Sequence, residues 1–437
     1  MSLDTTDAAD LTQQRKLSRR LFLGAGVGAA GAAAFGGFTP TAMAGGGGRS
    51  DVHVVGNETG GGGRRGRIVP RGRLGIQHWS VRDAVPRLNK SVSGYLGGPN
   101  FPDDPTDLGP LVPLPGGFGA VFEYLASVGY AGFEFFQLTQ GANGVITPEQ
   151  IRAALDRAHL VAAGAHMGPL PLMIDPVYRQ GQIDLAHILG HRMIGTAGDP
   201  LPTTGGNPPS GLLADWQMAA DQANMVGAAL RAVGLKYFFH PEQHWFRFFT
   251  DPAHPELDRV HRIDWFTDHT DPRYVFFEPD TMHTLAGRAR FVDPVDGRLF
   301  DHNAWFARLS ASKRLIAWHI KDAVRITPMV APGINPFSQN ITRPGFFANP
   351  DVVYVGEGSI GRGYPVDPDP QVLGFRETLS RYPLSEPGWF NNESDNSPGP
   401  AEDPGRSLRW AKVSARYTLN LEFAVHDHCM NPSMQHA

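Results

Sequence analysis

Short apolar runs alternate with longer amphipathic segments along the chain from residue 74 onward. Apolar runs rich in aromatic and β-branched side chains are typical of buried strands, whereas apolar positions spaced by three and four residues are typical of helices. The pattern predicts helices over 118–128, 147–159 and 215–233. The predicted strands cover 74–79, 131–136, 160–166 and 192–197, and four further runs end at His240, Asp280, His319 and Glu393.

Strands and helices that alternate in this way form parallel sheets covered by helices, and eight strands favour a closed barrel over an open sheet. We therefore expect an α/β fold, a (β/α)8 TIM barrel over 74–421, preceded by a flexible Gly/Arg-rich linker over 45–73 and followed by a tail over 422–437. Two irregular segments, 86–117 after the first strand and 323–354 after the seventh, are expected to be long loops. On the catalytic face such loops contact substrate, although insertions that form a homo-oligomer contact would have the same pattern.

The first 44 residues have the features of an export signal. The pair Arg19-Arg20 stands directly before a weakly apolar run over 24–38, and Ala42-Met43-Ala44 offers a cleavage site of small residues. A membrane anchor is the alternative, but the run is rich in Gly and Ala and short for a bilayer core of about 30 Å. We expect a twin-arginine signal peptide over 1–44, a periplasmic or extracellular mature protein, and no stable membrane span after cleavage.

Composition and charge exclude several classes of site and partner. The chain has 437 residues, of which 41% are hydrophobic and 19% charged, which is ample for a sizeable core. A formal net charge of -4 gives no basic field, so nucleic acid is not an expected partner. The one cysteine, Cys429, excludes an internal disulfide and a zinc site built from cysteines.

Four successive predicted strands end in a side chain that can hold a metal ion. In a parallel barrel the C-terminal ends of the strands gather on one face, so groups far apart in sequence can meet there. Two imidazoles and two carboxylates form a mixed nitrogen and oxygen donor set, which suits Mn, Co, Zn, Ni or Fe better than Mg or Ca. The pattern predicts a divalent metal centre with the ligands His240, Asp280, His319 and Glu393.

Such an ion needs a base and substrate-binding groups beside it. Lys321 and Glu134 are the favoured bases, and Glu393 is expected to act in catalysis as well as to bind the ion. The residues expected to contact substrate are Trp79, His166, Glu242 and His244. A strand-end histidine taken alone is more often a hydrogen-bonded structural group, and barrel cores also use aromatic rings such as those of Trp245, Phe246 and Trp389.

Two acids near the predicted ligands are expected to have supporting roles. Glu278, two residues before Asp280, is expected to face away from the site and to form a structural ion pair. Asp322, which follows Lys321, is expected to orient a neighbouring group.

Five segments of the chain resemble the xylose isomerase-like barrels, the sugar phosphate isomerase/epimerase family. They are 75–82 (GIQHWSVR), 122–134 (FEYLASVGYAGFE), 319–322 (HIKD), 355–358 (VGEG) and 393–395 (ESD). They resemble, in order, the opening strand, the first helix with the second strand, the seventh-strand motif, the segment after it, and the eighth-strand acid. The resemblance covers roughly residues 74–421.

The resemblance implies a divalent ion held at the ends of strands five to eight. Asp280, His319 and Glu393 match the aspartate, histidine and final glutamate of the family. His240 stands where the sugar epimerases have a glutamate, one of the two acids that move the proton there. Glu242 could replace that glutamate only if the strand ends earlier than the pattern predicts.

Three functions agree with these expectations. The first is a metal-dependent isomerase or epimerase of an unphosphorylated sugar or keto-sugar that works through an enediolate. The second is a lyase that performs β-elimination on a 3-keto-glycoside with the same ion. The third is a secreted, non-catalytic carbohydrate-binding protein. In each case the expected partner is a small sugar or glycoside.

Overall fold

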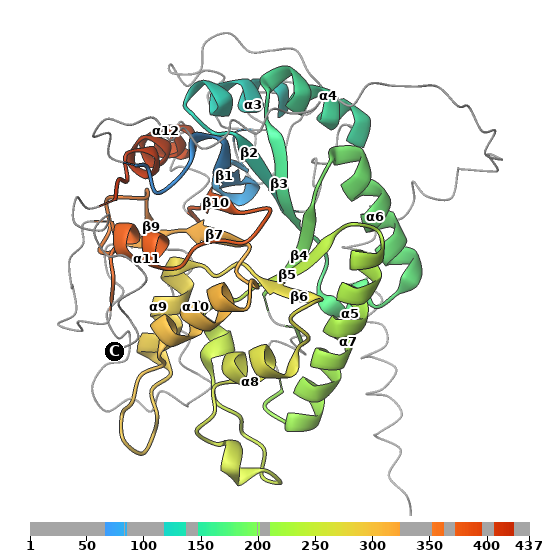
Figure 1. Ribbon diagram of the computed structural model, residues 1–437, viewed down its shortest axis with the longest axis vertical. Helices are drawn as coiled ribbons and strands as arrows, with labels where there is room; N and C mark the ends of the chain where they lie inside the picture. Colours follow the sequence, from blue (N-terminus) through green and yellow to red (C-terminus); the bar gives the residue numbers. More distant parts are fainter. Residues whose placement is uncertain are drawn as a thin grey trace, which may run out of the picture. The chain divides into compact units, whose positions relative to one another are not determined.

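The computed structural model describes residues 66–82, 84, 118–136, 147–198, 200–201, 210–323, 352–361, 372–395 and 406–423 (Figure 1). The predicted signal peptide, the predicted loop 86–117 and most of the predicted loop 323–354 lie outside the described residues. None of the described helices combines the length and the apolar character that a membrane crossing requires.

Eight parallel strands form the predicted barrel, which is confirmed. They are β1 (Leu74–Gln77), β2 (Gly132–Phe136), β3 (Val161–His166), β4 (Met193–Ala197), β5 (Lys236–His240), β6 (Val275–Phe277), β7 (Ala317–Ile320) and β10 (Trp389–Asn392). Their order in the sheet is β6-β5-β4-β3-β2-β1-β10-β7, so β10 is the eighth strand of the barrel. Parallel bridges from Phe277 to Leu315 and from Asp280 to His319 join β6 to β7 and close the ring.

Helices surround the strands in Figure 1. They are α3 (Phe118–Ser127), α4 (Pro148–Ala158), α5 (Leu170–Met173), α6 (Pro176–Leu189), α7 (Leu213–Ala232), α8 (Arg262–His269), α9 (Thr281–Arg290), α10 (His302–Ala311), α11 (Phe375–Arg381) and α12 (Arg406–Leu419). Short 3-10 turns among the described residues are η3 (Arg71–Arg73), η4 (His78–Val81), η6 (Gln243–Phe246) and η7 (Pro255–Leu257). Helix α4 begins as predicted, because the side chains of Thr147 and Gln150 form a reciprocal capping box and Pro148 occupies the first turn.

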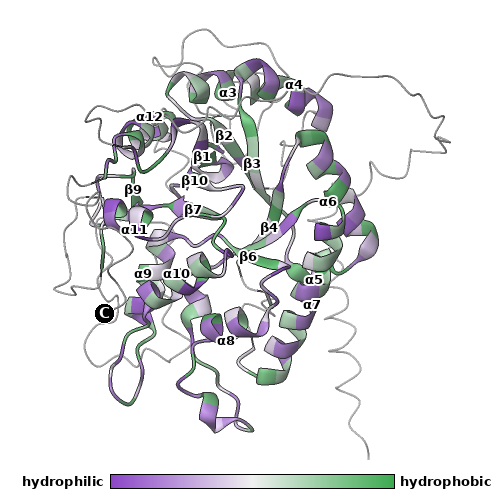
Figure 2. Cartoon of the chain, in the orientation of Figure 1, coloured by the Kyte–Doolittle hydropathy of each residue, from purple (hydrophilic) through white to green (hydrophobic). Residues whose placement is uncertain are grey.

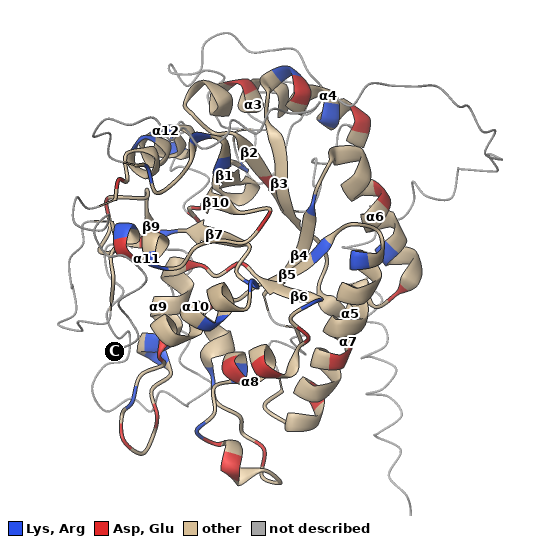
Figure 3. Ribbon diagram, in the orientation of Figure 1, with Lys and Arg blue, Asp and Glu red and all other residues tan. Residues whose placement is uncertain are grey.

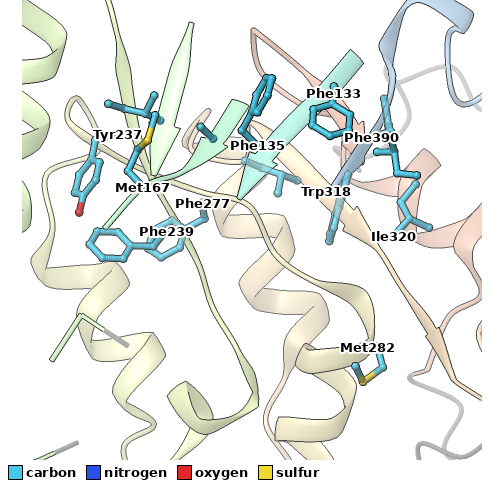
Figure 4. Close-up of a cluster of buried hydrophobic side chains, with 14 of the residues drawn as sticks. Phe133, Phe135, Met167, Tyr237, Phe239, Phe277, Met282, Trp318, Ile320 and Phe390 are labelled. Carbon is cyan, nitrogen blue, oxygen red and sulfur yellow. The ribbon is translucent and has the colours of Figure 1, made fainter. Parts of the chain in front are cut away.

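Side chains along each strand alternate between the helices and the barrel interior. Phe133, Phe135, Tyr237 and Phe239 point to the helices and are buried in the apolar layer between strands and helices (Figure 4). In Figure 2, β3 and β6 are largely hydrophobic, and the helices carry both hydrophobic and hydrophilic residues. Charged side chains of both signs are spread over the helices (Figure 3).

A smaller apolar cluster closes the interior of the barrel. It consists of Ala163, Met193, Phe238, Ile316, Ala317 and Trp389. Gly132 makes room for Trp389, since a Cβ atom on Gly132 would lie 2.6 Å from the indole ring. Trp389 is therefore part of this floor, and Trp245 and Phe246 are fully buried in the core, so none of the three offers an open face to a sugar.

The ordered barrel begins before residue 74. Arg67 forms an antiparallel bridge with Glu422, and the Ile68 amide donates to the Leu421 carbonyl. Val69 is fully buried. Residues 66–73, which the composition assigned to the linker, thus pack with the barrel and pair with the residues that follow α12.

Asp322 orients a loop, as expected of an acid beside the site. It lies in β8 (Asp322–Ala323), which pairs antiparallel with β9 (Val352–Val353). Its carboxylate accepts hydrogen bonds from the backbone amides of Gly356, Gly358, Ile360 and Gly361 at 3.0–3.1 Å. The seventh-strand motif and the VGEG segment are therefore physically joined by this one side chain.

Candidate metal centre

Polar side chains replace the apolar floor toward the C-terminal ends of the strands. Because side chains two residues apart share a face of a strand, Ala317, His319 and Lys321 all point inward from β7. The pairing of Asn391 with His319 places β10 in register, so that Trp389 lies in the floor and Asn391 and Glu393 lie above it. The interior is thus apolar below and charged above.

The four predicted metal ligands meet in this charged layer. We call them the outer group: His240, Asp280, His319 and Glu393. Each offers a ligand atom, and these atoms all lie within 4.8 Å of one another. They come from four successive barrel strands or the residues directly after them, as the sequence predicted. Asp280 and His319 are completely buried, and Glu393, at 8% exposure, is the most accessible of the four.

Local structure leaves ligand atoms of two of these residues available. His240 Nδ1 lies 3.2 Å from the Glu278 carbonyl, so a proton on Nδ1 leaves the lone pair of Nε2 for a cation. Asp280 Oδ1 caps α9 by accepting from the His283 amide at 2.6 Å. Asp280 Oδ2 is buried and has no hydrogen-bond partner. Burial and the neighbouring His319 and His166 hold the pKa of His240 well below its ordinary value, so its imidazole is neutral.

His319 lies between two carboxylates. Its Nδ1 is 2.7 Å from Glu393 Oε2, and its Nε2 is 2.5 Å from Glu134 Oε2. Burial acts to lower the pKa of His319, but the carboxylates of Glu278, Glu134 and Glu393 outweigh it and hold the pKa well above its ordinary value. A cation at this ring would take the place of its second proton.

A second set of buried groups lies on the Nε2 side of His319. We call it the inner group: Glu134, His166, Glu278 and His319. His166 Nε2 is 3.2 Å from Glu278 Oε2 and 3.5 Å from Glu134 Oε2. The His166 ring stacks on that of His319 with 5.1 Å between centroids. A set with His240 in place of Glu134 also has its ligand atoms within 4.8 Å of one another.

The expected outward orientation of Glu278 is wrong. Residues two apart along a strand point to the same face, so Glu278 shares the inward face with Asp280. It is completely buried and accepts a hydrogen bond from Asn391 Nδ2 at 2.9 Å. Asn391 and Glu278 were not predicted as site residues, yet each lies two residues before a predicted ligand, and this spacing was the available signal.

Lys321 reaches the outer group from β7. Its Nζ lies 3.1 Å from Glu393 Oε2, 3.1 Å from Asp395 Oδ2 and 3.5 Å from Asp280 Oδ2. Burial acts to lower the pKa of Lys321, but Asp395, Glu393 and Asp280 outweigh it and keep the pKa well above its ordinary value. Lys321 is therefore a charged ammonium held among carboxylates. Asp395 is a further site residue that the sequence reasoning did not single out.

Glu134 lies deeper than the other predicted proton-transfer residues. It is completely buried in β2, and its Oε1 has no hydrogen-bond partner. Burial and the adjacent Glu278 raise the pKa of Glu134 to about 7, against the opposing effect of His319 and His166. Its contacts are with the inner group, whereas Glu393 and Lys321 are on the other side of His319.

Three predicted substrate contacts lie after the first and fifth strands. Trp79 is half-buried in η4. Its ring centroid lies 5.0 Å from that of Phe136 and 4.0 Å from the guanidinium carbon of Arg82. Glu242 and His244 lie after β5, with 3.6 Å between Glu242 Oε2 and His244 Nδ1. Strand β5 ends at His240 as predicted, so Glu242 does not take the ligand position on that strand.

The residues present fit a divalent ion. The outer group supplies nitrogen and oxygen donors in the proportion that transition metals prefer. Asp280 Oδ2 is buried without a hydrogen-bond partner, and the Lys321 ammonium lies 3.5 Å away, so this oxygen keeps lone pairs for a cation.

A search of protein-family models finds no match, and a search of curated proteins finds none either. Among solved structures, a sugar phosphate isomerase/epimerase from Parabacteroides distasonis is 16% identical over 79% of this chain and 93% of its own, with a TM-score of 0.48. The probable 3-DHS dehydratase AsbF from Bacillus anthracis is 10% identical over 79% and 97%, with a TM-score of 0.45. An L-ribulose 3-epimerase is 12% identical over 79% and 92%, with a TM-score of 0.43. Identities this low transfer no activity to this chain.

Proposed function

We propose that this protein is a divalent-metal-dependent isomerase or epimerase of an unphosphorylated sugar or keto-sugar that works through an enediolate. The observation that carries the proposal is the outer group, in which four ligand-capable side chains from four strands converge within 4.8 Å. Independent structural roles would not require such groups at four successive strand ends.

The outer group would hold the ion, and its mixed donors favour Mn, Co, Zn, Ni or Fe over Mg. A bound ion of this kind polarises the carbonyl of a substrate and stabilises negative charge on the enediolate oxygens. His240 and Asp280 hold the ion in place, since each has its remaining polar atom bonded to the backbone.

Glu393 and Lys321 are the residues that we assign to proton transfer. Glu393 is the most accessible member of the outer group, and its Oε2 lies 3.1 Å from Lys321 Nζ. The Glu393 carboxylate would accept the proton from the carbon beside the substrate carbonyl and return it to a carbon of the enediolate. The Lys321 ammonium orients that carboxylate and donates a hydrogen bond to the substrate oxygen. Glu134, on the far side of His319, holds the imidazole in place. Trp79, half-buried beside Phe136 and Arg82, is kept as a proposed substrate contact.

Metal content and deuterium exchange test this function together. The purified protein is expected to contain a stoichiometric transition metal by elemental analysis. Incubation with candidate sugars and keto-sugars in deuterated water should give NMR spectra in which one carbon-bound proton is exchanged while the carbon skeleton and linkages are kept. His319→Ala should lose both the metal and the exchange. A metal-free wild-type protein that exchanges no substrate proton would refute the proposal and favour a carbohydrate-binding role.

The second candidate is a lyase that performs β-elimination on a 3-keto-glycoside. Two features favour it: His240 occupies the fifth-strand position that is an acid in sugar epimerases, and the Lys321 ammonium can donate a proton to a leaving group. Release of an aglycone in the same NMR experiment would identify the lyase.

We also propose that the protein is exported by the twin-arginine route, from the Arg19-Arg20 pair and the run after it. Phosphorylated sugars are mainly cytoplasmic, so an exported enzyme meets unphosphorylated substrates. Replacing both arginines by lysine should leave the protein in the cytoplasmic fraction of the cell. Equal export of this variant and the wild type would contradict the route.

A further inference from the structure

The inner group contains two carboxylates that the outer ion does not compensate. Glu134 and Glu278 are completely buried, and both contact the same two histidine nitrogens, those of His166 and His319. Two adjacent carboxylates that are both ionised in a buried site repel each other unless cations lie between them.

Several carboxylates and one ammonium group share the interior of the barrel. The carboxylates are those of Glu134, Glu278, Asp280, Glu393 and Asp395. Lys321 balances one of the five, and one divalent ion in the outer group balances two more. The other two carboxylates, Glu134 and Glu278, face the imidazoles of His166 and His319.

Three of the contacts within the inner group have the spacing of a tetrahedral metal site. Bonds of about 2.0–2.2 Å from a zinc-like ion to nitrogen and oxygen correspond to ligand–ligand distances of roughly 3.3–3.5 Å around a tetrahedron. The distances from His166 Nε2 to Glu278 and Glu134 are 3.2 and 3.5 Å, and that from His319 Nε2 to Glu278 is 3.4 Å. The fourth, a hydrogen bond of 2.5 Å between His319 and Glu134, has to open by about 1 Å when an ion replaces its proton.

Neighbouring groups orient the ligand atoms of the inner group, as hydrogen-bond partners do around metal sites. Asn391 Nδ2 bonds Glu278 Oε1 and leaves Oε2 facing the two histidines. Glu134 Oε1 is buried and has no hydrogen-bond partner, so it is available as a second oxygen for a cation. Orienting contacts of this kind fix the ligands and tune the affinity of metal sites.

We propose that the inner group binds a second divalent ion. His319 then binds the inner ion through Nε2, and its Nδ1 donates a proton to Glu393 Oε2, 2.7 Å away. The outer ion keeps His240, Asp280 and Glu393, which is the number of protein ligands that leaves a position open for substrate in catalytic zinc sites. This inference rests on the proposed metal-dependent function.

Metal stoichiometry and electron paramagnetic resonance (EPR) of the manganese form test the second ion. The full-length protein is stripped with a chelator, reloaded with Mn²⁺, freed of excess ion by gel filtration, and analysed for metal per chain. We expect two ions per chain and a frozen-solution EPR spectrum broadened by coupling between neighbouring Mn²⁺ ions. Glu278→Gln should bind one ion and show an uncoupled spectrum, and Asp280→Asn should also bind one.

Asp293→Asn is the matched control, because this buried carboxylate pairs with Arg259 away from the barrel interior, so the variant should still bind two ions. The second ion would be refuted if the wild type bound one uncoupled ion that Asp280→Asn lost and Glu278→Gln kept. The proposed function would then still stand. No bound ion would overturn both. If Glu278→Gln fails to fold, the wild-type stoichiometry and spectrum decide alone.

Discussion

The ammonium group of Lys321 has carboxylate oxygens on three sides, and its role can be separated from that of the metal ligands. Lys321→Met removes the donor to Glu393 and Asp395 but no ligand of the outer group. We expect the variant to keep its metal and to lose turnover by about 100-fold or more, the usual size of a proton-transfer contribution. Elemental analysis and the rate of deuterium exchange measure the two effects separately.

Lys412→Met is the control for Lys321, because Lys412 is exposed on α12 and should be silent in both measurements. If Lys321→Met kept full exchange with its metal in place, Lys321 would be structural. Loss of the metal together with exchange would make it a support for the ligands.

His191 gives the protein a pH-dependent stability that is unrelated to the site. It is buried before β4 against the ring of Phe135, and neither ring nitrogen has a hydrogen-bond partner. Burial and the nearby Arg152 lower the pKa of His191 to about 3. Below about pH 6.5 the unfolded chain binds a proton here and the folded chain does not, so stability falls as pH falls from about 6.5 to about 3, by up to about 1.4 kcal/mol per unit.

His191→Leu should flatten the dependence of unfolding free energy on pH in that window and change stability little at pH 8, where no proton is involved. Urea unfolding at several pH values measures this. The exposed His187, one turn earlier, provides His187→Leu as a control. An unchanged slope in His191→Leu would show that His191 takes up its proton in the folded state.

At the scale of elements, the strands were predictable because each is a short apolar run. The ends of the strands were predictable because each run stops at a polar group. The start of α4 was predictable because Thr147, Pro148 and Gln150 are the residue types that cap and begin a helix. The packing of residues 66–73 was not predictable, because their Gly/Arg-rich composition gives no sign that they pair with residues 421–423, far away in sequence.

The outer group was predictable from strand ends alone, but the inner group depends on alternation within strands. Glu278 lies two residues before Asp280, and Asn391 two residues before Glu393, each on the inward face. Polar residues at this spacing inside apolar runs are the signal of a second layer. The distances between the layers depend on how the closed barrel staggers its strands, which no single run specifies.

Asp322 joins two elements, and its removal should loosen both. Asp322→Ala leaves the amides of Gly356, Gly358, Ile360 and Gly361 without their acceptor, which should lower the unfolding free energy by about 3 kcal/mol or more. Asp322→Asn keeps part of the acceptor capacity and should cost less. Denaturant unfolding gives the free energies, and amide hydrogen exchange should become faster in residues 356–361.

Asp296→Ala is the comparison, since this exposed carboxylate also accepts a backbone amide, that of Arg298, and should change stability by less than about 1 kcal/mol. If Asp322→Ala were as mild as Asp296→Ala, the loop would be held by its other contacts and not by this carboxylate.

At the scale of the whole molecule, the barrel places these carboxylates in a largely buried interior, so bound cations should stabilise the fold as well as the reaction. Removal of metal by a chelator should lower Tm by several degrees, since an ion at 100 times its Kd contributes about 2.7 kcal/mol. The far-UV circular dichroism at 25 °C should not change, because the strands and helices are held by the apolar layer of Figure 4. Adding back Mn²⁺ or Zn²⁺ should restore Tm, and His319→Ala should have a low Tm that added metal does not raise. Elemental analysis could show that the metal is gone while the wild-type Tm stays the same. Protons on the buried acids and histidines would then stabilise the interior as well as a cation does. In that case the buried carboxylates would give no support to either ion.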